Sequence, residues 1–175
     1  MVGNSGVGKD TIVDILCKKT GYRKVVTCTT APRRSDQVDG VHHYFVSKER
    51  FREIMGNGHT LAYTKIGDNE YVTALDLLDE KMKFYIIDPK GVEELERDYQ
   101  DEIDLVKIYI HVPEEIRRQR TSKRGNYDFD KRRLDEEAQF EKFDREKKWD
   151  LRVENIDLDK SVDTIMNFLG WDKAE

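Results

Sequence analysis

The run Gly3-Asn4-Ser5-Gly6-Val7-Gly8-Lys9-Asp10-Thr11 constrains this chain more than any other segment. Its glycines let the backbone curl so that successive N–H groups point inward, where they can bind the oxygens of a phosphate. Apolar residues follow at Ile12, Ile15 and Leu16 with helical spacing. The helix that they predict adds its positive N-terminal end to the same site. We therefore expect a phosphate-binding loop over residues 3–11 and assign each of these residues to ATP binding.

The last residues of this loop carry its charged groups. Lys9 is predicted to reach the β- and γ-phosphates, which makes it a candidate catalytic residue. The next position, commonly Ser or Thr in such loops, is Asp10, followed by Thr11. A carboxylate can supply an oxygen to Mg²⁺, directly or through water. Asp10 is therefore the candidate ligand for a Mg²⁺ ion that accompanies ATP.

Only Met1 and Val2 precede Gly3. Phosphate loops normally follow a buried strand of about five apolar residues. We therefore expect a short first strand and a sheet that lacks much of one central strand.

Length and composition suit a single α/β domain. Charged residues make up 38% of the chain and the formal net charge is -5, which argues against a nucleic-acid binder. No stretch approaches the ~20 apolar residues of a membrane span. Cys17 and Cys28 lack metal-type spacing and indicate reduced thiols of a cytoplasmic protein. We expect no nucleic-acid or membrane partner, and a monomer or a homodimer.

The remaining pattern alternates between helices and strands, which predicts a parallel sheet with helices on both faces. Gly67-Asp68-Asn69 predicts a hairpin turn between two strands. The predicted helices cover residues 9–20, 47–55, 74–82, 93–99, 130–147 and 162–169, with another that starts at Glu114. The predicted strands cover residues 24–28, 43–46, 61–66, 70–73, 84–87, 105–112 and 151–154.

The segment 27–46 carries a resemblance to a known family. Thr29-Thr30, Arg34, Val38-Asp39-Gly40 and Phe45-Val46-Ser47 resemble the guanylate kinase pattern TTRxPRxGExxGxDYxFVS. The resemblance continues over nearly the whole chain. Its further matches are Tyr71 with Thr73, Asp88 with Gly91, Arg124-Gly125, Arg133-Leu134, and Asn155 with Asp157-Leu158.

The resemblance implies a P-loop NTPase fold of the α/β class, with a three-layer α/β/α core around a parallel sheet. It also implies a small β-rich NMP-binding insertion and a helical lid. The chain would form one domain over residues 1–175. Its core would comprise residues 1–28, 74–112 and 148–175, its insertion residues 29–73, and its lid region residues 113–147.

The same resemblance implies roles for individual residues. Arg34 and Tyr71 would hold the phosphate of the acceptor, with His43 in place of a family Tyr. Ala31 replaces the family's first insertion arginine, for which Arg33 can substitute. Near the base, the implied residues are Thr27, Thr73 and Asp88. In the lid, Arg124 and Arg133 would clamp the transferring phosphoryl group, with Arg132 as the alternative to Arg133. Asn155 would contribute to ATP binding.

The implied activity is ATP-dependent phosphoryl transfer to a nucleoside monophosphate, GMP or dGMP above others. One family residue is replaced, since a guanine-reading Glu aligns with Ala62. Two alternatives stay open. Asp10 and Ala62 also suit a ribose 1,5-bisphosphate phosphokinase, and the fold also serves as a non-catalytic binding module. The intact Gly8-Lys9 argues against the module.

Overall fold

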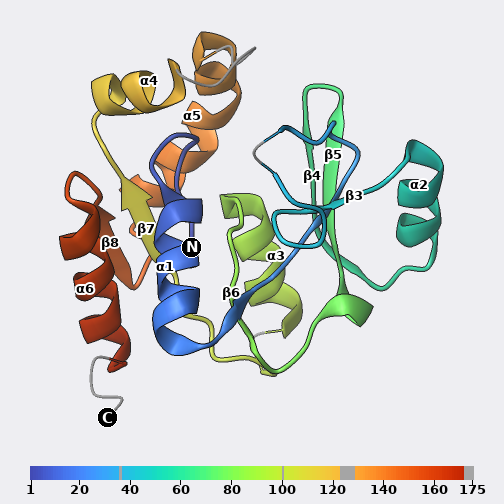
Figure 1. The fold of residues 1–175 in the computed structure, drawn as a ribbon, viewed down its shortest axis with the longest axis horizontal. Helices are drawn as coiled ribbons and strands as arrows, with labels where there is room; N and C mark the ends of the chain where they lie inside the picture. Colours follow the sequence, from blue (N-terminus) through green and yellow to red (C-terminus); the bar gives the residue numbers. More distant parts are fainter. Residues whose placement is uncertain (36, 100, 123–128, 172–175) are drawn as a thin grey trace. The chain divides into compact units, whose positions relative to one another are not determined.

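The computed structural model describes residues 1–35, 37–99, 101–122 and 129–171, except for the side chains of Arg132 and Asp135. The chain forms two compact units, shown in Figure 1. The first unit joins Met1–Tyr22 to Asp104–Glu175, and the second is Arg23–Ile103.

The first unit contains the predicted loop, which leads directly into helix α1 (Lys9–Thr20). Strands β7 (Ile108–His111) and β8 (Leu151–Glu154) pair in parallel, with Ile108 opposite Leu151. Val2 makes a parallel bridge to Tyr109 and exchanges two 2.8 Å backbone hydrogen bonds with Ile108 and Ile110. Among the described residues, the pairing of the segment before the loop consists of this single bridge.

Four helices lie in the described part of this unit. They are α1, α4 (Glu114–Ser122), α5 (Phe129–Arg145) and α6 (Leu158–Leu169). Helix α6 packs against α1 and β8. Helix α5 lies against β7, where the rings of Phe143 and Tyr109 are 5.9 Å apart. The phosphate loop is thus carried by a packed α/β layer.

The second unit contains a four-stranded sheet in the order β3-β2-β5-β4. Its strands are β2 (Cys28–Thr29), β3 (Tyr44–Phe45), β4 (Thr60–Ile66) and β5 (Asn69–Ala74). The predicted hairpin is confirmed, because β4 and β5 pair antiparallel through Ile66 and Asn69. Strands β1 (Arg23–Lys24) and β6 (Met82–Phe84) form a separate parallel pair. Helix α3 (Pro89–Tyr99) packs against β4.

Helix α2 (Lys48–Gly56) shares a core with this sheet. Its Ser47 cap is confirmed, because the Ser47 side chain accepts a hydrogen bond from the backbone N–H of Arg50. Phe51 packs there with Cys28 and Val72, which are almost fully buried. Since neighbouring residues of a strand point to opposite faces, Tyr71 and Thr73 lie on the face opposite Val72.

Several predicted elements differ from the structure. The helix predicted over residues 74–82 is wrong: only a 3₁₀ turn at Leu75–Leu77 forms before β6. The Asp79 carboxylate accepts a hydrogen bond from the backbone N–H of Lys81 at 2.8 Å. Such local side-chain bonds compete with helical ones. The strand predicted over residues 24–28 is divided between β1 and β2, which belong to different sheets. The strand predicted over residues 84–87 overlaps β6 only at Phe84, and the one predicted over residues 105–112 is shorter in the structure. Lys147, at φ 51°, lies beyond the end of α5 at Arg145.

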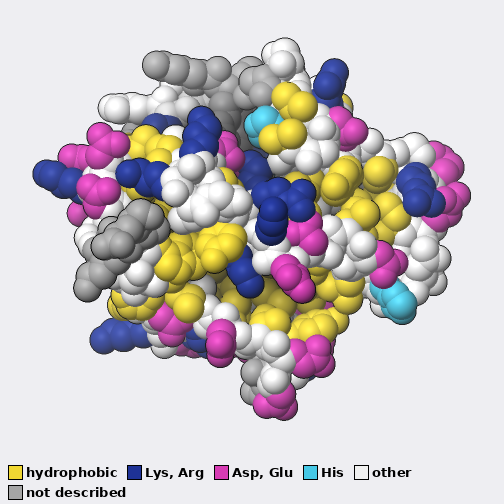
Figure 2. All heavy atoms as spheres, turned by 60° about the horizontal axis from the view of Figure 1, so that its bottom comes forward, with side chains coloured by type: hydrophobic (Ala, Val, Ile, Leu, Met, Phe, Trp, Pro, Cys, Tyr) yellow, Lys and Arg dark blue, Asp and Glu magenta, His cyan; other side chains and the backbone are white. Residues whose placement is uncertain are grey.

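Charged side chains of both signs occur across the face drawn in Figure 2. No helix among the described residues is long and apolar enough to span a membrane.

Candidate active site

The phosphate loop depends on glycine at two close approaches. Gly8 has φ 94° at the N-terminus of α1, and an added Cβ would lie 2.5 Å from Nδ2 of Asn155. At Gly3, with φ 151°, a Cβ would lie 2.2 Å from the carbonyl oxygen of Ile110. Real Cβ atoms do not approach other atoms so closely, so larger residues at either position would displace the loop.

Lys9 folds back over the loop that precedes it. Its Nζ donates hydrogen bonds to the carbonyl oxygens of Gly3 and Asn4, the latter at 3.0 Å. The ammonium group therefore lies at the loop backbone, where the sequence predicts phosphate binding. Asp10 and Thr11 are exposed on the first turn of α1.

Two side chains from other elements hold the loop at Val7. Asn155, which is 2% exposed, donates from Nδ2 to the Val7 carbonyl at 2.7 Å. Arg120 of α4 reaches the same carbonyl at 3.3 Å and donates to the Asn155 carbonyl at 2.8 Å. Oδ1 of Asn155 has no hydrogen-bond partner among the described residues. The structure thus gives Asn155 a loop-holding role, which it shares with Arg120, a residue that the sequence analysis did not select.

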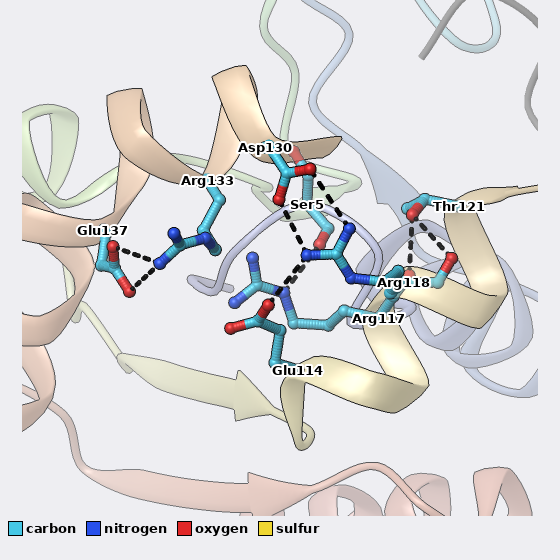
Figure 3. Close-up of polar contacts among 8 residues, drawn as sticks. All are labelled: Ser5, Glu114, Arg117, Arg118, Thr121, Asp130, Arg133 and Glu137. Atoms are coloured by element: carbon cyan, nitrogen blue, oxygen red, sulfur yellow. Dashed lines mark hydrogen bonds and ion pairs between the residues drawn. The ribbon is translucent and has the colours of Figure 1, made fainter. Parts of the chain in front are cut away.

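The lid arginines form specific ion pairs, drawn in Figure 3. Arg133 donates from Nη1 to both carboxylate oxygens of Glu137, at 2.8 and 2.9 Å. Arg118 joins α4 to α5 by pairing with Glu114 at 3.1 Å and Asp130 at 2.8 Å. These hydrogen bonds raise the pKa of Arg118, and the hydrogen bond from Arg118 lowers the pKa of Asp130. Arg124 and the side chain of Arg132 lie outside the described residues.

The loop also contacts α4 and α5 directly. Nε of Arg117 donates to the Ser5 carbonyl at 3.3 Å. Glu136 of α5 accepts hydrogen bonds from the backbone N–H and the hydroxyl of Ser5. The sequence gave no indication of either contact, because each joins residues more than a hundred positions apart.

A cavity of about 540 Å³ borders the loop at Asn4 and α4 at Arg117. Its other lining residues include Tyr109, Trp149 and Arg152, together with carboxylates of α5. This volume falls in the range of small-molecule sites. Of the residues that the sequence predicted for ATP binding, only Asn4 lines it.

In the second unit, three candidate acceptor residues lie together. Nδ1 of His43 is 2.7 Å from the Thr27 hydroxyl. The ring of His43 meets the ring of Tyr71 edge-on at 5.7 Å. Thr27, His43 and Tyr71 therefore form one polar and aromatic group. Arg33 and Arg34 are exposed in the segment before β3, where Arg34 and Gln37 make a turn with two 3.1 Å hydrogen bonds.

Asp88 and Thr73 belong to a second group in this unit. Asp88 accepts from the Gly91 backbone N–H at 2.7 Å and from the hydroxyl of Thr64. Thr73 is fully buried and its hydroxyl bonds to that of Tyr85. Burial raises the pKa of Tyr85, and the carboxylates of Asp88 and Glu94 act in the same direction. Two carboxylates therefore lie close to one phenol.

Ala62 marks the edge of the same group. It has a left-handed φ of 55° within an irregular part of the β4–β5 pairing. Its backbone N–H donates to Oε2 of Glu94 at 3.0 Å. Position 62 therefore has no carboxylate of its own, but one from α3 lies beside it. Glu94 is a candidate that the sequence reasoning missed, since its proximity depends on how α3 packs on β4.

Comparisons with known proteins indicate the same family that the sequence motifs resemble. A family model described as "Guanylate kinase" matches residues 1–171. The guanylate kinase of Mycoplasmoides gallisepticum is 31% identical, over 95% of this chain and 88% of the relative. That of Wolbachia pipientis wMel is 32% identical, over 98% and 88%.

A crystal structure of guanylate kinase from Anaplasma phagocytophilum is similar to this chain with a TM-score of 0.67 and 23% identity. The match covers 99% of this chain and 85% of that one. This likeness shows the fold, a phosphate-loop α/β arrangement with parallel strands, as the sequence predicted.

Proposed function

The chain belongs to the guanylate kinase family, and from this we propose that it transfers the γ-phosphoryl group of ATP to the phosphate of GMP or dGMP. The observation that carries the proposal is the phosphate loop, with Lys9 lying over its backbone at the start of α1. The chain also spans most of the length of the guanylate kinases that it resembles. None of these comparisons favours a ribose bisphosphate acceptor or a non-catalytic module.

On the donor side, the residues from Gly3 to Thr11 bind the phosphates of ATP. Lys9 turns from the loop carbonyls toward the β- and γ-phosphates. Asn155 contributes to ATP binding by keeping the loop in shape through the Val7 carbonyl. Arg133 and Arg124 neutralise charge on the transferring group, which requires Arg133 to exchange its ion pair with Glu137.

Mg²⁺ fits the donor site through Asp10. A magnesium ion bound with nucleotide keeps several waters and needs only one or two protein carboxylates besides the phosphates. Asp10 is exposed on the first turn of α1, so a hydrated ion can reach its carboxylate. The ion would neutralise phosphate charge when bound.

On the acceptor side, Arg34 and Tyr71 hold the phosphate of the monophosphate, assisted by Arg33 and by His43. Thr27, Asp88 and Thr73 belong to the base site, where we add Glu94. Carboxylates only accept hydrogen bonds. Two of them suit the guanine edge, where N1–H and the N2 amino group are adjacent donors. Adenine offers no such pair, so this group would discriminate between the two bases.

The reaction requires little covalent chemistry from the protein. The acceptor phosphate is already anionic, so no general base is needed. Alignment of the two phosphates and neutralisation of their charge account for most of the rate. Exclusion of water by the lid limits wasteful ATP hydrolysis.

We also propose the functional division into a core of residues 1–28, 74–112 and 148–175, an acceptor-binding insertion of residues 29–73 and a lid of residues 113–147. The two cysteines are free thiols, which suits a cytoplasmic enzyme. The assembly is a monomer or a homodimer.

The test is a coupled ADP-release assay with GMP, dGMP, AMP, CMP, UMP and ribose 1,5-bisphosphate as acceptors. We expect the highest kcat/KM for GMP or dGMP. A preference for ribose 1,5-bisphosphate would overturn the acceptor, and ATP binding without any turnover would indicate a binding module.

Lys9→Ala should lower kcat by about 10²- to 10³-fold with the fold preserved, because it removes a charge that stabilises the transferring group. Lys19→Ala, at the far end of α1, is the matched control. If Lys9→Ala retained more than about a tenth of the wild-type turnover, Lys9 would not be a catalytic residue.

A further inference from the structure

A carboxylate of the chain itself occupies part of the phosphate loop. Oε2 of Glu136 accepts a hydrogen bond from the backbone N–H of Ser5 at 2.9 Å, and Oε1 accepts one from the Ser5 hydroxyl at 2.5 Å. Glu136 is only 8% exposed, although it lies on a highly charged helix. Burial of a carboxylate is costly unless its oxygens are hydrogen-bonded. The loop supplies two of the bonds that meet this need.

A phosphate group of a nucleotide could also bind to these two donors. The inward-pointing N–H groups of a phosphate loop are an anion site, and a carboxylate resembles a phosphate edge in charge and in acceptor geometry. The backbone N–H of Ser5 cannot make a full hydrogen bond to Glu136 and to a phosphate oxygen at once. Carboxylate and phosphate would also repel each other at this distance.

The positively charged side chains near the loop also bind to other groups of the protein. Arg117 of α4 donates to the Ser5 carbonyl, and Lys9 donates to the carbonyls of Gly3 and Asn4. Arg133 lies three residues before Glu136 on α5, on the same side of the helix, and pairs with Glu137. Loop, α4 and α5 are thus joined by contacts within the protein.

We propose that Glu136 is an internal competitor of the nucleotide: its carboxylate fills the Ser5 anion position until a phosphate of the nucleotide displaces it. The proposal rests on the donor site of the proposed function. It makes Glu136 a positioning residue that ties α5 to the empty loop. Displacement by phosphate releases the segment of α5 that carries Arg133, so nucleotide binding and rearrangement of the lid become coupled.

The coupling lowers apparent affinity. A site that is open in only a fraction of the molecules binds with an affinity reduced by that fraction. Removing the charge of Glu136 should therefore tighten binding, whereas a merely structural role would predict weaker binding.

The experiment measures the dissociation constants of ATP and of inorganic tripolyphosphate by calorimetry on the full chain. Glu136→Gln should tighten both by about tenfold. Asp163→Asn, which removes a charge from an exposed position of α6 away from the loop, should leave both within about twofold of wild type. Tripolyphosphate separates this proposal from the proposed function, since its binding requires no phosphoryl transfer.

A second readout is the amide proton of Ser5 in the protein without nucleotide. Its NMR resonance should move upfield in Glu136→Gln, because the hydrogen bond to a charged acceptor is lost, and should stay in place in Asp163→Asn. Glu136→Asp keeps the charge but ends one methylene short of the loop. Glu136→Asp should also tighten binding of both ligands. This variant replaces Glu136→Gln in the experiment if Glu136→Gln does not fold.

Unchanged or weaker binding of both ligands in folded Glu136→Gln or Glu136→Asp would overturn the proposal, as would an unmoved Ser5 resonance in Glu136→Gln. Tighter tripolyphosphate binding without kinase activity would support this inference while contradicting the proposed function.

Discussion

A carboxylate from helix α3 lies beside residue 62 of strand β4. Ala62 offers no carboxylate, and its backbone N–H instead meets the carboxylate of Glu94 on α3. Asp88 lies at the start of the same helix and is held by Gly91 and Thr64. A base-reading pair of carboxylates can therefore exist although one position in the resembling pattern is changed.

Glu94→Gln should lower the preference for GMP over AMP about ten- to a hundredfold in kcat/KM, the equivalent of ~1–3 kcal/mol for one good base contact. The amide keeps the size of the side chain but presents a donor where the guanine edge also presents donors. Glu93→Gln, at an exposed position of the same helix, is the control. An unchanged GMP/AMP ratio in the folded Glu94→Gln protein would show that Glu94 does not face the base.

Arg34→Ala should raise the KM for GMP about ten- to a hundredfold and leave the KM for ATP nearly unchanged. The reason is that a hydrogen bond between charged groups contributes ~1.5–3 kcal/mol, and Arg34 is proposed to contact only the acceptor phosphate. Initial rates over a grid of both substrates measure the two constants. Arg52→Ala in α2 serves as the control. Equal weakening of both substrates would place Arg34 elsewhere.

At the scale of elements, the contact of α5 with the strand pair β7–β8 is lined by polar groups as well as rings. Arg152 of β8 donates to both oxygens of Asp144 of α5, at 2.9 and 3.0 Å. It also reaches Nε2 of His111 on β7, at 2.6 Å. Because an arginine only donates, His111 must accept with an unprotonated nitrogen. Burial, and then the charge of Arg152, lower the pKa of His111.

This arrangement predicts a loss of stability in mild acid. A histidine with a lowered pKa in the folded state binds its proton more tightly when the chain is unfolded. Its contribution is present above about pH 6.5, the usual histidine pKa, and is lost as the pH falls below it. Thermal midpoints between pH 8 and pH 5 should therefore fall less in His111→Asn than in the wild type. Parallel curves for the two proteins would contradict this assignment, and His59→Asn, at an exposed histidine, should follow the wild type.

At the scale of the whole molecule, the chain passes from one compact unit into the other and back. The donor candidates, from the loop to Asn155, belong to the first unit. The acceptor candidates, from Thr27 to Asp88, belong to the second. Each substrate should therefore order a different part of the chain.

Amide hydrogen exchange can test whether the two substrates bind to different units. A non-hydrolysable ATP analogue should slow exchange of the loop amides and the first turn of α1, since phosphate oxygens take up those N–H groups. GMP alone should slow exchange in the second unit, around β5 and the start of α3. Protection by GMP confined to the first unit would contradict the acceptor assignment.

Local patterns in the sequence predicted much of this molecule. The glycine spacing from Gly3 to Gly8, the Ser47 cap and the Gly67–Asn69 turn all rest on backbone geometry within a few residues, so the loop, α2 and the hairpin could be inferred directly. The prediction failed over residues 74–82, where a helix was expected. There the carboxylate of Asp79 bonds to the backbone instead.

The contacts that complete the site were decided only by the tertiary structure. Glu136 meets Ser5 across 131 positions, Asn155 meets Val7 across 148, and Glu94 meets Ala62 through the packing of a helix on a strand. No periodicity or motif encodes such pairs, because they depend on which faces of distant elements pack together. The sequence by itself therefore determined that the chain carries a phosphate loop of the guanylate kinase type. Folding decided which other side chains hold that loop, occupy it, or lie beside the base-reading carboxylate.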